Sequence, residues 1–248
     1  MPDLAAAYAD TRASMVALTA DLDEGTLAER VPACPDWSIK ELLAHVTSIS
    51  ASLASGEFPA DLNPSLFWDP DTAVRREAFV DQGLETRRQQ PIDAILCEWL
   101  ETAQPLEAMM RGHEPWPSWP DGAPPLPEWI LVTDLAVHHH DLRGALDAPG
   151  ERDSLATGLS LRSYVEGMRF RSAVEQLPTF TIIAGSREWT IGSADPVATV
   201  SADAFELARA ASGRRSPDQV RAFDWTGDPE PVLHCFFPYG LRADALVE

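Results

Sequence analysis

Lysine is almost absent from this sequence: Lys40 is the only one, and arginine supplies the other basic side chains. The 19 basic residues are outnumbered by 39 acidic residues, which gives a formal net charge of −20. A surface this acidic repels phosphate backbones and anionic lipids. We therefore expect neither a nucleic acid nor a membrane as a partner.

Long apolar runs are also missing, because polar residues interrupt every apolar stretch well before the roughly 20 residues that a membrane span needs. The N-terminus lacks the basic and apolar regions of a signal peptide. The three cysteines, Cys34, Cys97 and Cys235, are few and widely spaced, which favours a reducing compartment over a disulfide framework. We expect a cytoplasmic protein in which Cys34 is structural and Cys97 and Cys235 lie in the core.

Helical spacing of apolar residues dominates the first ~150 residues. It predicts helices over about 3–22, from Ser38 onward, over 71–110 and over 127–146. Ser38 and Glu41 form a capping box, and Pro91 predicts either a kink or a division of the third helical stretch. Four antiparallel helices with such connections form a bundle.

The pattern changes after about residue 150. A helix near 153–171 is followed by alternating segments that are typical of short strands, and then by a further helix over 202–211. The expected strands cover 179–183, 188–191 and 197–200. The predicted fold class is therefore α+β, with a helical bundle over 1–150 and a small α+β domain over 151–248.

A candidate metal site comes from two of the predicted helices. Asp134 and His138 are four residues apart and therefore share one helix face, while His45 shares the inward face of its helix with Leu42 and Ile49. Three nitrogen and oxygen donors with one open position are typical of catalytic zinc-type sites. The alternatives are a buried histidine with an ordinary partner and, for the Asp134–His138 pair, a solvated ion pair.

The residues around Asp134 and His138 favour a buried helix, because Trp129–Val132 and Leu135–Val137 are too apolar for an exposed one. Asp141 lies three residues after His138, where it could orient the imidazole or serve as a fourth ligand. His139 and His140 point about 100° and 200° away from His138, so we do not expect them to be ligands.

Four segments of the sequence resemble the maleylpyruvate isomerase-like, mycothiol-dependent enzymes of the DinB/YfiT-like metal-binding superfamily. Residues 34–46 match the pattern C-P-x-W-x-x-x-x-L-x-x-H, and residues 134–146 resemble the family's E-x-x-x-H-x-x-D motif. Residues 203–216 and 224–228 are similar to the family's second domain, which is likened to sterol carrier protein 2. The resemblance implies a DinB-like four-helix bundle, a sterol-carrier-like α+β domain and an actinobacterial host.

The resemblance also assigns roles to individual residues. It implies that His45, Asp134 and His138 hold a divalent metal, usually taken as zinc, although the family pattern has glutamate where this chain has Asp134. Arg214 and Arg215 would pair with a carboxylate of the thiol cofactor or substrate. A cation pair that stabilises the end of a helix is the alternative for these two arginines.

The function implied by the resemblance is that of a metal-dependent enzyme that uses mycothiol, a small thiol, on a small-molecule substrate. A thiol that coordinates a metal loses its proton and becomes a nucleophile. Such a thiolate supports cis–trans isomerisation, by addition and elimination, or S-transfer. The alternatives are a non-catalytic protein that binds a metal or a small ligand and, less favoured, a metallohydrolase.

Overall fold

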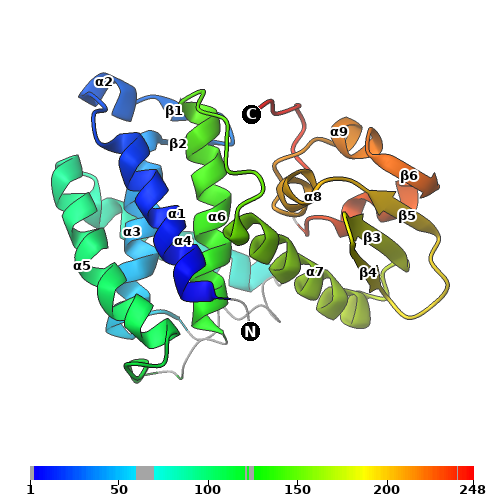
Figure 1. Ribbon diagram of the computed structural model, residues 1–248, viewed down its shortest axis with the longest axis horizontal. Coiled ribbons are helices and arrows are strands. Elements are labelled where there is room, and N and C mark those ends of the chain that lie inside the picture. The colour runs from blue at the N-terminus through cyan, green and yellow to red at the C-terminus, as the bar shows by residue number, and fades with distance from the viewer. Residues whose placement is uncertain (1–2, 60–69, 121, 123–125, 239) are drawn as a thin grey trace. The chain divides into compact units, whose positions relative to one another are not determined.

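The computed structural model describes residues 3–59, 70–120, 122, 126–238 and 240–248. The chain divides into two compact units: Met1–Gly150 together with Glu248, and Glu151–Val247. The first unit is helical, and the second combines helices with a four-stranded sheet (Figure 1). The predicted α+β fold class is therefore confirmed.

Four helices of the first unit form the bundle. Helices α1 and α3 each pack against both α5 and α6, which closes a ring of contacts, whereas α4 packs against the outside of α3. The stretch over 71–110 is two helices, and Pro91 is the N-cap of the second. The helices of this unit are α1 (Leu4–Thr19), α2 (Glu24–Leu27), α3 (Ile39–Ser55), α4 (Pro70–Arg87), α5 (Ile92–Met110) and α6 (Pro127–Ala145).

The start of α3 is fixed by the capping box that the sequence predicts. The Ser38 hydroxyl accepts a hydrogen bond from the backbone N–H of Glu41, and the Glu41 carboxylate accepts one from the backbone N–H of Ser38. This cap sets the rotation of the helix, and a stripe of apolar side chains faces the bundle core. The buried stripe consists of Leu42, Val46, Ile49 and Leu53.

The segment before α3 is more regular than the sequence indicates. Instead of a simple turn, it forms a short antiparallel ladder between β1 (Arg30–Val31) and β2 (Cys34–Ser38), in which Val31 pairs with Cys34. Strand β1 also packs against α6. A two-residue strand is too short to show any alternation of apolar residues, so the sequence could not predict it.

The second unit begins with α7 (Leu155–Glu175), and its sheet has the order β4-β3-β5-β6. The predicted hairpin is formed by β3 (Phe180–Ala184) and β4 (Arg187–Ile191), which pair antiparallel. Strand β5 pairs parallel with β3 and antiparallel with β6, which the sequence did not predict. The remaining elements are β5 (Ala198–Ser201), α8 (Ala204–Ala211), α9 (Pro217–Arg221), β6 (Asp224–Gly227) and the 3-10 helix η1 (Glu230–Cys235).

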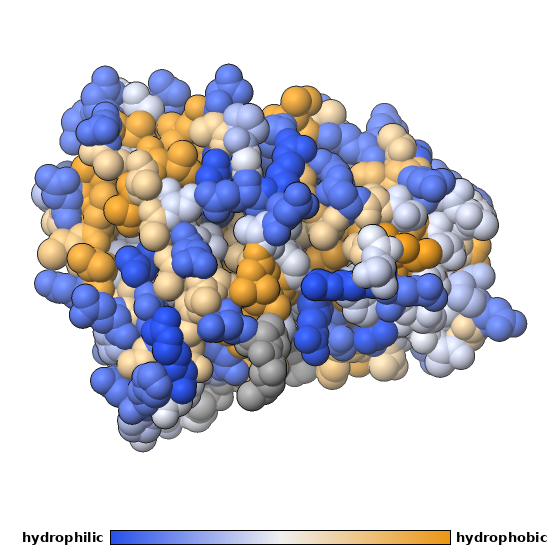
Figure 2. Space-filling model, in the orientation of Figure 1, coloured by the Kyte–Doolittle hydropathy of each residue, from blue (hydrophilic) through white to orange (hydrophobic). Residues whose placement is uncertain are grey.

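Two further expectations concern the polarity of the surface and the burial of the cysteines. On the face shown in Figure 2, hydrophilic side chains are spread widely and interrupt the apolar patches. Across the described residues, none of the helices has the length and apolar character required to cross a membrane. Cys235 is buried, but Cys97 is exposed, so its predicted place in the core is wrong. Its neighbours Ile95 and Trp99 take the inward face of α5.

Candidate metal centre

The three predicted metal ligands come together in the first unit. His45 lies on α3, and Asp134 and His138 lie one turn apart on α6, which packs against α3. One potential ligand atom from each of the three residues lies within 4.8 Å of the other two. Both histidines are buried, whereas the Asp134 side chain is 26% exposed. Asp134 is therefore the most exposed of the three donors.

The distances within this group match those around a tetrahedral metal ion. Oδ1 of Asp134 lies 3.2 Å from Nε2 of His45 and 3.6 Å from Nε2 of His138. Bonds of about 2.1 Å at tetrahedral angles place neighbouring ligand atoms about 3.4 Å apart. The shorter aspartate side chain therefore reaches both imidazoles, so the donor set fits a divalent cation.

Asp141 orients the His138 ring. Its fully buried carboxylate accepts a hydrogen bond at 3.0 Å from Nδ1 of His138. Burial lowers the pKa of His138 and so favours the neutral imidazole. The neighbouring Asp134 carboxylate has the opposite but smaller effect on this pKa. With the proton on Nδ1, the lone pair of Nε2 faces the negatively charged oxygen of Asp134. A cation between these two atoms would turn that repulsion into attraction.

Trp37 is a neighbour that the sequence analysis did not assign to the site. It lies on β2, and its ring centroid is 4.7 Å from that of His45 and 5.6 Å from that of His138. The indole therefore covers both imidazoles and keeps water away from that side, which strengthens electrostatic interactions there. The sequence signals were its place one residue before the helix cap and its place in the C-P-x-W pattern, neither of which indicated a role.

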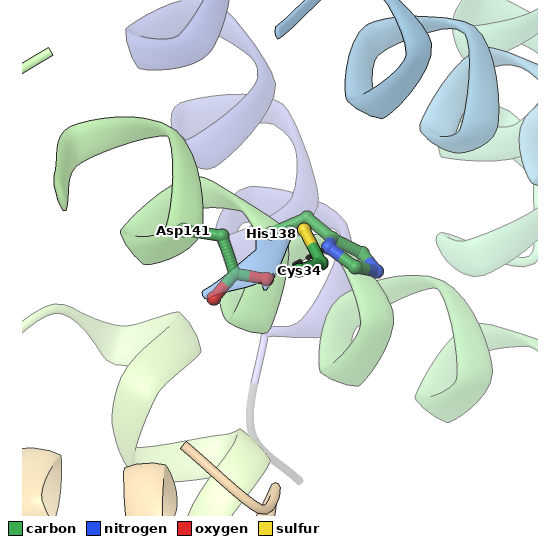
Figure 3. A group of neighbouring side chains, drawn as sticks. All are labelled: Cys34, His138 and Asp141. Atoms are coloured by element: carbon green, nitrogen blue, oxygen red, sulfur yellow. Dashed lines mark hydrogen bonds and ion pairs between the residues drawn. The ribbon is translucent and has the colours of Figure 1, made fainter. Parts of the chain in front are cut away.

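Cys34, which the sequence analysis interpreted as structural, also lies beside the site. Its sulfur, a ring nitrogen of His138 and a carboxylate oxygen of Asp141 all lie within 4.8 Å of one another (Figure 3). The reason is the short β1–β2 ladder, which brings β2 back beside α6. This cysteine is half-buried and is not part of a disulfide.

The two histidines next to His138 take other roles. Nε2 of His139 accepts a hydrogen bond from Nε of Arg143 at 3.0 Å and lies 3.1 Å from the hydroxyl of Ser14 on α1. His140 is buried, and its ring lies 5.3 Å from that of His139. Neither residue belongs to a group of potential metal ligands among the residues that the structure describes.

Arg214 and Arg215 lie in the second unit, after α8. Arg215 is buried, and its guanidinium donates two hydrogen bonds to the carboxylate of Glu206, from Nε at 2.6 Å and from Nη2 at 3.0 Å. Arg214 donates from Nη1 to the carbonyl of Ser212. Arg215 is thus held by an ion pair with Glu206 that the sequence analysis did not anticipate, and a cofactor-binding role for the two arginines stays a prediction.

With the geometry established, comparison with known proteins supplies the family. Residues 8–143 match the family model described as the mycothiol maleylpyruvate isomerase N-terminal domain, which is more than half of the chain. The chain belongs to this family. The matched residues lie in the first, helical unit, and the predicted family resemblance is confirmed. A search of curated proteins found no match.

Two solved structures share the fold of most of the chain. One is a mutant of a mycothiol-dependent maleylpyruvate isomerase, with a TM-score of 0.61 and 13% identity over 91% of this chain and 93% of that chain. The other is a mycothiol-dependent maleylpyruvate isomerase with a TM-score of 0.57 and 14% identity, over 86% of this chain and 90% of that chain. At such identity the likeness establishes the fold, and any shared activity is a proposal.

Proposed function

We propose that this protein is a metal-dependent enzyme that uses a small thiol, of the mycothiol-dependent isomerase or S-transferase type, on a small-molecule substrate. One observation carries the proposal: the ligand atoms of His45, Asp134 and His138 lie within 4.8 Å of one another, and the two distances from Asp134, 3.2 and 3.6 Å, are close to those between neighbouring ligands of a tetrahedral zinc ion. Family membership and the shared fold support a thiol as the fourth partner.

A divalent ion held by these residues would supply Lewis acidity that lowers the pKa of a bound thiol. The residues of the chain prepare that position. Asp141 holds the proton of His138 on Nδ1 and so keeps Nε2 available, while Trp37 shields both imidazoles from water. Asp134 offsets part of the charge of the ion and, being partly exposed, marks the side from which a thiol can approach.

Cobalt-substituted protein provides a direct test, because a thiolate bound to Co²⁺ gives a near-ultraviolet charge-transfer band. The Cys34→Ser variant is used so that the only nearby sulfur is that of added mycothiol. We expect the band to appear on addition of mycothiol and to be absent from Cys34→Ser/His45→Ala. If mycothiol produces no band in the single variant, the thiol-using function is wrong.

A turnover assay then separates the possible activities. The zinc-loaded protein is mixed with mycothiol and maleylpyruvate, the compound named for the structural relatives, or with mycothiol and an electrophile that carries a leaving group. Isomerisation of the first or thioether formation from the second supports the respective activity. Turnover of an ester that persists without any thiol would instead indicate a metallohydrolase.

A further inference from the structure

The imidazole of His138 has potential ligands on both sides. Nε2 faces Asp134 and His45, whereas Nδ1 is 3.0 Å from Oδ2 of Asp141. Cys34 completes a second group with His138 and Asp141, whose ligand atoms lie within 4.8 Å of one another. In Figure 3 the sulfur and the carboxylate lie on the side of one ring nitrogen, and the other nitrogen points away.

The second group has the chemistry of a zinc-type site. A thiolate, an imidazole nitrogen and a carboxylate oxygen are all accepted by Zn²⁺ and by analogues such as Co²⁺ and Cd²⁺. His138 and Asp141 are one turn apart on α6, and Cys34 is held on β2 by pairing with Val31. All three donors therefore lie in secondary structure, and their position does not depend on a long loop.

The tautomer of His138 decides which group has a free nitrogen. A neutral imidazole carries one N–H. When the proton is on Nδ1, it is donated to Asp141 and Nε2 is available to the first group. When the proton is on Nε2, Oδ1 of Asp134 lies 3.6 Å away as its nearest carboxylate oxygen, and Nδ1 is available to the second group. A neutral His138 therefore serves one group at a time.

We propose that Cys34, His138 and Asp141 form a second, thiolate-containing site for a divalent metal, which competes with the first site for His138. On binding, the metal takes the place of the thiol proton of Cys34, which is released to solvent. The proton of His138 moves from Nδ1 to Nε2, and no electron is transferred. The site is distinct from the proposed catalytic centre, although the two share one imidazole.

The intact protein fills the first site in preference to the second. Binding at the second site breaks the hydrogen bond between His138 and Asp141 and displaces a thiol proton, whereas binding at the first site leaves both in place. Removing His45 takes a nitrogen ligand from the first site and leaves all three donors of the second. The metal then moves to the side of His138 that carries the sulfur.

Titration with Co²⁺ tests this competition, with no mycothiol present. The His45→Ala variant should bind one Co²⁺ per chain and show the thiolate-to-cobalt band, and His45→Ala/Cys34→Ser should lose both. His45→Ala/Cys97→Ser, which removes an exposed cysteine instead, should retain the band. The wild-type protein should bind one Co²⁺ without the band.

A second variant guards against effects of His45→Ala on folding. Asp134→Ala removes a less buried donor of the first site and should also develop the band, while circular dichroism follows the helix content of each variant. The proposal is overturned if neither variant shows the band, or if the band survives Cys34→Ser. In that case one Co²⁺ in the wild type would still support the first site, so the two proposals can fail separately.

Discussion

The two units of this protein place ionisable side chains in different surroundings. In the second unit, buried Arg171 and Arg215 are paired with Glu175 and Glu206, so cation and anion are both supplied by the chain. In the first unit, the potential ligand atoms of His45, Asp134 and His138 lie within 4.8 Å of one another, and both groups of potential metal ligands found among the described residues lie there.

The two units differ in what offsets the cost of burying polar and charged groups. A buried charge needs a partner of opposite sign or a metal, because the loss of hydration is otherwise not offset. The second unit meets this need internally. The first unit also contains such a pair, between buried Arg87 and Glu98, but its cluster of His45, Asp134 and His138 brings together three donors that could hold an added cation.

The largest expected effect follows from removing the shared imidazole. Because His138 takes part in both groups of potential ligands, His138→Ala should abolish stoichiometric binding of Zn²⁺ and Co²⁺, as measured by elemental analysis after gel filtration. The control is His113→Ala, which removes an exposed histidine and should leave the metal content unchanged. One metal per chain in the His138→Ala variant would show that the metal does not need this imidazole.

The second unit should respond in stability instead of metal content. Arg215→Ala leaves the Glu206 carboxylate without its buried partner and should lower the free energy of unfolding by about 3 kcal/mol in urea titrations. Its metal content should not change.

The chain offers a matched control for that change. Arg221 also makes two hydrogen bonds with one carboxylate, that of Glu230, but the Arg221 side chain is 41% exposed against 3% for Arg215. Arg221→Ala should therefore lower the free energy of unfolding by much less than Arg215→Ala does, because solvent screens this pair. Equal effects of the two substitutions would show that burial does not set the contribution of these pairs.

A smaller effect is expected from the residue that orients His138. Asp141→Asn keeps the shape of the side chain but removes the charge that favours the Nδ1–H tautomer, so zinc affinity should fall about 10- to 100-fold in competition with a chelator. Ser14→Ala, which removes a contact of the neighbouring His139, is the control and should not change it. Unchanged affinity in Asp141→Asn would mean that Asp141 does not support the site.

The smallest effect concerns pH and the second unit. Burial raises the pKa of the Cys235 thiol from 9.0 to about 11, so the folded state holds this proton more tightly than the unfolded state. The resulting stability is fully present below about pH 9 and is lost as the pH rises toward 11. Urea titrations between about pH 9 and 11 should show a steeper fall in the free energy of unfolding for the wild type than for Cys235→Ala. An equal fall in both would contradict a raised pKa of Cys235.

Most of the helices and the three central residues of the candidate site could be predicted from helical periodicity. The capping box at Ser38 sets the rotation of α3, and the four-residue spacing of Asp134 and His138 fixes their common face, so their approach to His45 could be predicted. The positions of Cys34 and Trp37 could not, because they depend on a ladder that begins with a two-residue strand. Strand β6 was missed for a similar reason, since its four residues show no apolar alternation.

The most direct test of the central claim is X-ray absorption at the zinc edge of wild-type protein that holds one Zn²⁺ per chain, without added thiol. Ligation by His45, Asp134 and His138 predicts nitrogen and oxygen scatterers at about 2.0–2.2 Å and no sulfur. A sulfur scatterer at about 2.3 Å, or a protein that retains no zinc, would contradict it.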